Sequence, residues 1–267
     1  MTSDSVRFQF GENWASYSQL IDDTRIEQAR QGLLAFFKPE DLKGVSFLDI
    51  GCGSGLHSLS ALMLGVGRLV AFDYDTNSVS TTQALLQARQ PGGSWQVSQG
   101  DVLKLTPEAL GQFDVVYSWG VLHHTGHMVE AIQNAARFVK PGGKFMIAIY
   151  GKTPFCGFWK IEKRWYSKRG PLARKVAHFV YKLVLGMRLA LRGQTLGAYR
   201  KWYFVQRGME LEHDIADWMG GYPYESATPK TITDLVEDLG FKTLKVQAVK
   251  SIGLLGTGCD EFLFQRA

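Results

Sequence analysis

An apolar run that ends in three alternating glycines constrains the fold of this chain more than any other feature. Residues 47–55 read Phe-Leu-Asp-Ile-Gly-Cys-Gly-Ser-Gly, and a second apolar run ends at Asp73. The run from Val45 to Ile50 is typical of a strand buried inside a parallel sheet. Glycines directly after such a strand let the backbone turn tightly and approach a ligand without a Cβ atom in the way. The pattern predicts a buried strand, a ligand-binding turn and a helix that begins near Leu56.

The spacing of the glycines separates two kinds of nucleotide-cofactor site. Dinucleotide-binding turns carry GxGxxG, in which the third glycine lets the helix pack closely on the strand. Here that position is Leu56 and the pattern is GxGxG, which disfavours nicotinamide and flavin cofactors. Asp49 to Gly55 instead resembles the first motif of the class I S-adenosylmethionine (SAM) methyltransferases, an acidic residue followed by one residue and GxGxG. In that family the loop faces the methionine moiety of SAM.

The resemblance continues in order along the chain. Leu69 to Asp73 resembles the second strand of the family, which implies that Asp73 binds the ribose hydroxyls and that Tyr74 lies beside the adenine. Asp101 resembles the acid that accepts from the adenine amino group, and Ser118 begins a segment like the one that borders the methyl group. The cofactor-binding residues that the resemblance implies are Asp49, Gly51, Cys52, Gly53, Gly55, Asp73, Tyr74, Asp101, Val102 and Ser118.

The family resemblance also implies the architecture. It covers about residues 37–150 and 230–266 and implies an α/β fold with a seven-stranded Rossmann-like sheet of order 3-2-1-4-5-7-6 and helices on both faces. The predicted domains are an N-terminal cover at 1–30, a SAM-binding core at 31–150 and 230–267, and a helical basic insertion at 151–229 that forms a substrate lid.

Charge is concentrated in the insertion. Residues 152–201 contain thirteen Lys and Arg against the single acid Glu162, a balance of +12, whereas the whole chain carries +5. Gly170-Pro171 predicts a helix start, and from there apolar residues recur every three or four positions. The apolar stripe is Leu172, Val176, Phe179, Val180, Leu183, Met187 and Ala190, and the basic side is Arg174, Lys175, Lys182, Arg188 and Arg192.

This amphipathic helix, residues 172–192, has two main interpretations. It is either a lid that packs its apolar stripe on the core and leaves its charges in solvent, or a surface helix that contacts anionic lipid. Lys160 to Arg169 interleaves aromatic and basic residues, as a nucleic-acid surface does, but no base-reading motif accompanies it. The expected partner is therefore a small-molecule substrate, with peripheral membrane contact as an alternative and nucleic acid disfavoured.

The N-terminal stretch is rich in aromatic residues. Trp14 and Tyr17 are candidates to face the sulfonium of the cofactor, because a cation is attracted to an aromatic ring. Tyr17 is also a candidate substrate contact. The alternative is a staple that packs the first helix onto the sheet. By resemblance, N-terminal segments and insertions after strand five often form the substrate-specific cover in this family.

Residues 207–225 combine acids, aromatics and glycines and suggest a loop-rich wall around the substrate. His213 with Asp214, or His124, is the predicted general base, because imidazole titrates near neutral pH. His123 and His124 have an alternative role in supporting the cofactor pocket, and the histidines near residue 124 show helical spacing but no metal signature, so no metal is predicted. The candidate substrate contacts are Tyr17, His123, Tyr203, Arg207, His213, Tyr222 and Glu225.

These features predict a methyltransferase that converts SAM to S-adenosylhomocysteine and methylates an oxygen, nitrogen or carbon atom of a small metabolite under a lid. The alternatives are a quinone-like amphiphilic acceptor at a membrane surface and a non-catalytic SAM-binding protein. Three widely spaced cysteines support neither a disulfide framework nor a zinc site. Without a visible signal peptide, the expected location is the cytoplasm, with the inner face of the membrane as an alternative.

Overall fold

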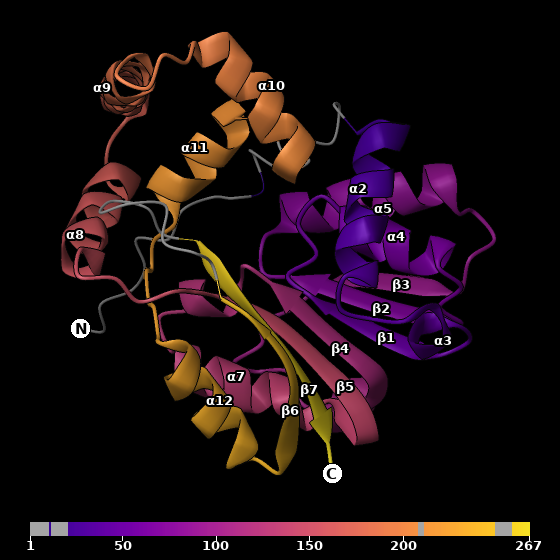
Figure 1. Ribbon diagram of the computed structural model, residues 1–267. Helices are drawn as coiled ribbons and strands as arrows, with labels where there is room; N and C mark the ends of the chain where they lie inside the picture. Colours follow the sequence, from indigo (N-terminus) through magenta and orange to yellow (C-terminus); the bar gives the residue numbers. More distant parts are fainter. Residues whose placement is uncertain (1–10, 12–20, 208–210, 249–257) are drawn as a thin grey trace.

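Seven strands form one mixed sheet in the computed structural model, which describes Gly11 and residues 21–207, 211–248 and 258–267 (Figure 1). The strand order is β3-β2-β1-β4-β5-β7-β6, which confirms the predicted order. Only β7 runs antiparallel, against both β5 and β6. The strands are β1 (Ser46–Ile50), β2 (Arg68–Asp73), β3 (Trp95–Gln99), β4 (Phe113–Trp119), β5 (Val139–Tyr150), β6 (Phe241–Gln247) and β7 (Cys259–Arg266).

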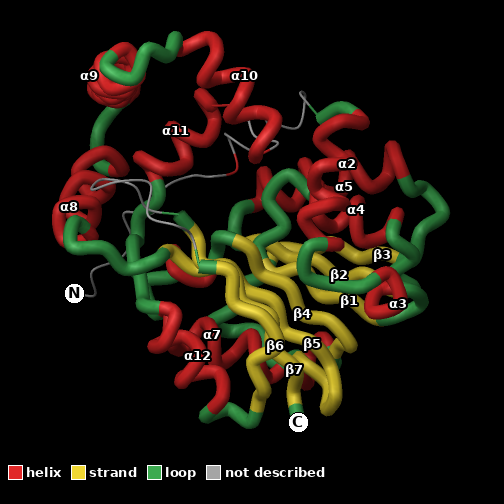
Figure 2. Tube along the Cα trace, viewed as in Figure 1, coloured by secondary structure: helices red, strands yellow, loops and turns green. Residues whose placement is uncertain are grey.

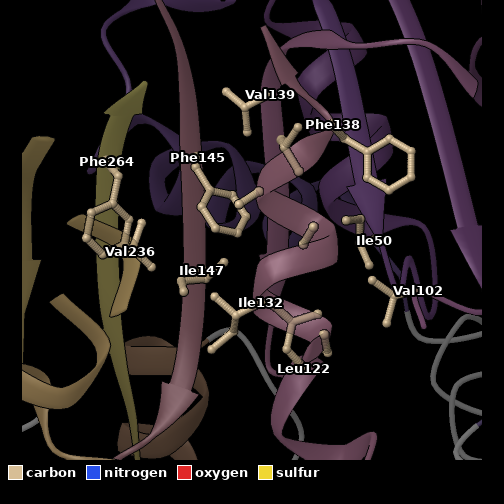
Figure 3. Packing of buried hydrophobic residues seen from close by; sticks show 14 of the residues in the cluster. Ile50, Val102, Leu122, Ile132, Phe138, Val139, Phe145, Ile147, Val236 and Phe264 are labelled. Carbon is tan, nitrogen blue, oxygen red and sulfur yellow. The ribbon is translucent and has the colours of Figure 1, made fainter. Parts of the chain in front are cut away.

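Helices cover both faces of the sheet (Figure 2). On one face α2 (Asp23–Leu34), α4 (Leu56–Met63) and α5 (Thr76–Arg89) pack their apolar sides on β1, β2 and β4. On the other face α7 (Met128–Arg137) and α12 (Pro229–Glu237) do the same. Figure 3 shows Ile132 of α7 and Val236 of α12 among the buried side chains of β5 and β7. The short elements α3 (Pro39–Leu42), α6 (Pro107–Leu110) and the 3₁₀ helix η1 (Leu122–His124) complete the core.

The segment between β5 and α12 is helical, and Figure 1 shows its helices together at the end of the domain away from the C-terminus. Its helices are α8 (Cys156–Ser167), α9 (Pro171–Ala190), α10 (Leu196–Arg207) and α11 (Leu211–Gly220). They share a small apolar cluster of their own, formed by Tyr166, Tyr203, Leu211, Ile215 and Met219. The insertion is therefore held by its own core as well as by the strand end from which it departs.

The orientation of α9 differs from the expectation that its apolar stripe packs on the core. Leu172, Phe179 and Leu183 are 77%, 66% and 52% exposed. Part of the basic side faces inward instead: Arg174 donates to the Ser167 carbonyl at 3.2 Å, and Lys182 Nζ lies 3.1 Å from Glu212 Oε2, whereas Lys175 and Arg192 are exposed. The expectation is wrong because Glu212 of α11 supplies an inward-facing partner for a lysine that the sequence pattern assigned to solvent.

The described helices include none that is both long enough and apolar enough to cross a membrane.

Candidate active site

The turn after β1 depends on glycine at particular positions. Gly51 has φ +78°, and a Cβ atom there would lie 2.4 Å from Val121 Cγ2. Gly55 has φ +79°, and its Cβ would lie 3.0 Å from the Cα atom of Thr82 in α5. Residues other than glycine rarely adopt this left-handed backbone conformation, and both positions also lack room for a side chain. Glycine at these two positions thus lets the turn pass close to Val121 and to α5.

Asp73, at the end of β2, holds the turn by hydrogen bonds. Its Oδ2 accepts from the Gly53 N–H at 3.0 Å, and its Oδ1 accepts from the Asp75 N–H at 2.9 Å. Burial raises the pKa of Asp73, while these backbone N–H groups oppose the shift. The carboxylate lines a cavity outside the strand ends, where open α/β sheets bind their ligands.

Other cofactor candidates line the same cavity. Gly51, Tyr74, Asp101 and Val102 are all part of its wall. The Tyr74 side chain is 54% exposed, and Asp101 Oδ1 accepts from the Leu103 N–H at 3.0 Å. These groups fit a nucleoside cofactor. The Asp73 carboxylate suits ribose hydroxyls, and the accessible Tyr74 ring and the Asp101 carboxylate suit an adenine.

Three further cofactor candidates lie behind this wall. Asp49 is buried and accepts from Ser58 Oγ at 2.6 Å, and burial raises its pKa to about 7. Cys52 is also buried, and its Sγ accepts from Thr82 Oγ1 at 3.4 Å. Ser118 donates to the Ile50 carbonyl at 3.0 Å. In this structure the three side chains stabilise the turn and the neighbouring strand ends.

The cavity measures about 1160 Å³ and extends from the glycine turn to the helical insertion. Small-molecule pockets usually measure about 300–1,000 Å³, so this cavity has room for two ligands side by side. The far end is lined by aromatic side chains that the sequence did not identify as site residues. They are Tyr150, Trp159, Trp165, Tyr181, Tyr199 and Trp218, together with the predicted Tyr203.

The aromatic side chains form a connected group. The Trp218 ring centroid of α11 lies 5.4 Å from that of Tyr150 at the end of β5 and 5.3 Å from that of Trp159 in α8. Both pairs have edge-to-face geometry, which aromatic rings prefer. The density of Trp and Tyr in the insertion was the signal available in the sequence, but their convergence depends on how α8 and α11 pack.

Two carboxyl groups, those of Asp214 and Glu162, line the cavity together with these rings. Asp214, a predicted catalytic residue, lines the cavity, and burial raises its pKa to about 7. Burial also raises the pKa of Glu162 to about 7, opposed by the neighbouring Lys163. A buried acid that titrates near neutral pH in a cavity is suited to proton transfer.

The two histidines after β4 occupy different surroundings. His124 lines the cavity, and its Nδ1 lies 2.7 Å from the Pro223 carbonyl oxygen, so Nδ1 carries the proton of that hydrogen bond. His123 is fully buried, with its ring centroid 4.0 Å from that of Tyr150. Burial lowers the pKa of His123 well below the usual value, which keeps the ring neutral.

The remaining candidates are scattered. Tyr222 and Glu225 lie outside the cavity wall, and Glu225 Oε2 accepts from the Met128 N–H at the start of α7 at 2.9 Å. Trp14 and Tyr17 lie outside the described residues, as do the side chains of Arg207 and His213.

The start of the chain approaches the cofactor end of the cavity. The Gly11 N–H donates to Asp75 Oδ2 at 3.1 Å, and Asp75 lines the cavity beside Asp73.

Comparisons with known proteins place the core in a recognised family. Residues 48–147 match the model of the family described as "Methyltransferase domain". A tRNA U34 carboxymethyltransferase from Hydrogenovibrio crunogenus is 38% identical over 152 residues, which are 53% of this chain and 44% of that protein. A ubiquinone biosynthesis O-methyltransferase from Xanthomonas oryzae pv. oryzae is 33% identical over 114 residues, 43% of this chain and 46% of that protein. The chain thus spans about half the length of the curated relatives it matches.

A solved structure shares the fold over nearly the whole chain. The magnesium protoporphyrin IX methyltransferase of Synechocystis PCC 6803, with bound SAH, has a TM-score of 0.55 at 15% identity, covering 94% of this chain and 84% of that one. The matched domain includes the glycine turn, Asp73 and Asp101, and the sheet has the order that the motif resemblance implied. Residues 48–147 thus match the methyltransferase domain family, and the whole sheet has the fold of the class I (Rossmann-like) SAM-dependent methyltransferases.

Proposed function

We propose that this protein transfers a methyl group from SAM to a small molecule that has an apolar, ring-containing body and a protic nucleophile. The observation that carries the proposal is one continuous cavity, which joins Asp73 and Asp101 to the aromatic wall around Trp218. Methyl transfer requires both substrates in contact, and alignment of two bound reactants can account for about 7–11 kcal/mol of the barrier.

The strand ends provide the cofactor half of the proposed site. The Asp73 carboxylate binds the ribose hydroxyls, the Tyr74 ring borders the adenine, and Asp101 accepts from the adenine amino group. SAM supplies an electrophilic methyl group on a positively charged sulfur. Removal of water by the aromatic wall strengthens electrostatic attraction between that charge and the nearby carboxylates.

The insertion provides the acceptor half, so residues 151–229 act as the acceptor-binding lid. Its Trp and Tyr rings bind an apolar body by dispersion and stacking. Asp214 accepts the proton that an oxygen, nitrogen or acidic carbon nucleophile releases, because its pKa of about 7 leaves a large fraction ionised at neutral pH. The approach of Gly11 to Asp75 supports the role of residues 1–30 as a cover over the cofactor end.

Two relatives suggest different acceptors. The ubiquinone biosynthesis O-methyltransferase supports a ring-containing small molecule, whereas the tRNA carboxymethyltransferase suggests nucleic acid. The aromatic cavity favours the first, since it is suited to one enclosed ring system.

The test is transfer of radiolabelled methyl from SAM into a cell extract that is then separated into organic-soluble, small aqueous and macromolecular fractions. We expect label in one of the two small-molecule fractions with the wild-type protein and none with Asp73→Asn. Label confined to RNA or protein would contradict the proposed acceptor class. Absence of label from every fraction, despite measurable SAM binding, would favour a non-catalytic SAM-binding protein.

A further inference from the structure

The outward side of α9 is an exposed apolar surface. We call its residues Leu172, Val176, Phe179, Val180, Leu183 and Met187 the apolar face; each side chain is about half exposed or more. At 100° per residue these six positions fall within a sector of about 100°. A monomeric soluble protein rarely leaves so continuous an apolar stripe in water unless it binds a partner.

The inward side of α9 is already occupied. Leu189 is buried, Arg174 bonds to the Ser167 carbonyl, and Lys182 pairs with Glu212. Turning the helix to bury the apolar face would break these interactions and expose Leu189. The outward orientation is therefore the one that the packing of α8, α9 and α11 supports.

Basic residues flank the apolar face at both ends of the helix. Lys168, Arg169 and Lys175 are exposed at its start, and Arg192 is exposed just after its end. They belong to a segment, residues 152–201, whose charge balance is +12. A helix with an apolar side and flanking Lys and Arg has the composition of one that lies in the interface of an anionic membrane.

Charge and polarity also favour one of the possible binding partners of the apolar face over the others. A second copy would bring the same +12 segment into contact with the first, so like-charge repulsion opposes self-pairing. Nucleic acid would satisfy the charges but would leave six apolar side chains without an apolar partner. An anionic bilayer offers both an acyl boundary and negative headgroups.

The cavity reaches this surface. Val176 and Val180 belong both to the apolar face and to the cavity wall, and the exposed Phe158 and Trp165 of α8 line it too. A molecule dissolved in the outer part of a bilayer would thus meet the cavity at the point where the helix touches the lipid.

We propose that α9 docks this protein on an anionic membrane surface, with the apolar face in the acyl boundary and the flanking basic residues on the headgroups. The acceptor is then an amphiphile that enters from the lipid; this second part rests on the proposed function. Phe179 and Leu183 do not line the cavity, so they report on docking alone.

The experiment is co-sedimentation of the full chain with vesicles of phosphatidylcholine alone or mixed with phosphatidylserine. We expect binding to the mixed vesicles only. The Phe179→Gln/Leu183→Gln variant should lose roughly tenfold in partition coefficient for each apolar side chain. Lys168→Gln/Arg169→Gln/Lys175→Gln should lose roughly fivefold for each charge, or about a hundredfold.

Matched controls keep the test specific. Leu244→Gln replaces an exposed apolar residue of β6, and Lys104→Gln removes an exposed charge far from α9 in sequence; neither should change binding. Unchanged melting temperatures show that all variants fold. Equal binding to neutral and anionic vesicles, no binding at all, or undiminished binding by the α9 variants would overturn the proposal.

Two other results would assign the surface to a different occupant and so overturn it. One is a dimer in solution that Phe179→Gln/Leu183→Gln dissociates. The other is single-stranded RNA binding that only the basic variant weakens. Sedimentation requires neither SAM nor methyl transfer, so vesicle binding without label transfer refutes the proposed function alone, and label transfer without vesicle binding refutes the docking alone.

Discussion

Asp49 and Asp73 are carboxylates at adjacent strand ends, but they lie in different surroundings. Asp73 lines the cavity, whereas Asp49 is buried against Ser58 behind the glycine turn. Both pKa values are raised by burial. The motif indicated that both residues belong to the cofactor site, and the structure adds that only one of the two carboxylates faces the cavity.

Asp49→Asn should change how stability depends on pH. The carboxyl pKa is about 7 in the folded protein against 3.8 as the ordinary value, so between these values the folded state holds a proton that the unfolded state has lost. Folding stability of the wild type therefore falls as pH rises through this window. Asparagine still accepts from Ser58 but does not titrate.

Urea unfolding of both proteins without cofactor, at pH 5 and pH 8, checks this expectation. The stability of Asp49→Asn relative to the wild type should increase by about 2–3 kcal/mol between the two pH values. A difference that is the same at both pH values would show that Asp49 is already ionised in the folded protein.

Asp214→Asn should abolish a pH-dependent limb of the methyl-transfer rate. With a pKa of about 7, the wild-type carboxylate becomes available as a base as pH rises through 7, and the rate should rise with it. The variant should be about 10²–10⁴-fold slower and lose that limb. Asp217→Asn, which changes a neighbouring cavity carboxyl, is the control and should keep it. A variant with the wild-type profile would remove Asp214 from the mechanism.

At the scale of elements, Lys163 connects two helices of the insertion. This lysine of α8 is fully buried, donates to the Trp218 carbonyl of α11, and lies 3.5 Å from the centroid of the Trp218 ring. Burial lowers its pKa to about 7. In the sequence Lys163 contributes to the +12 balance of residues 152–201, but a charge count does not show which charges a helix turns inward.

Lys163→Met should alter the alkaline side of the stability profile. Between about pH 7 and 10.5 the unfolded state holds a proton that the folded state has lost, so the stability of the wild type rises with pH. Methionine fills similar space without titrating. The melting temperature of the wild type relative to the variant should therefore be higher at pH 9.5 than at pH 7. The same difference at both pH values would mean that Lys163 stays charged when buried.

The helix α9 shows what periodicity determines. The spacing of its apolar residues correctly indicated a helix and the residues that share one side. It did not determine which side faces the protein, because that choice depends on partners such as Glu212 and Ser167 on other elements.

For the whole molecule, the resemblance of the motifs to those of the class I methyltransferases implied the strand order, and the sheet confirms it. The sequence motifs did not predict the cavity. Its wall combines strand ends with aromatic residues more than sixty positions apart along the chain, such as Tyr150 and Trp218, and their meeting depends on packing within the insertion.

Calorimetric titration of SAM into the wild-type protein and Asp73→Asn, with Glu130→Gln as a surface control, tests whether the Asp73 carboxylate binds the cofactor. Charge-assisted hydrogen bonds contribute about 1.5–3 kcal/mol each, so loss of the carboxylate that binds two ribose hydroxyls should weaken binding at least a hundredfold. Glu130→Gln should bind like the wild type. Equal affinity of a folded Asp73→Asn variant, or no binding by the wild type, would contradict the cofactor site described at the end of β2.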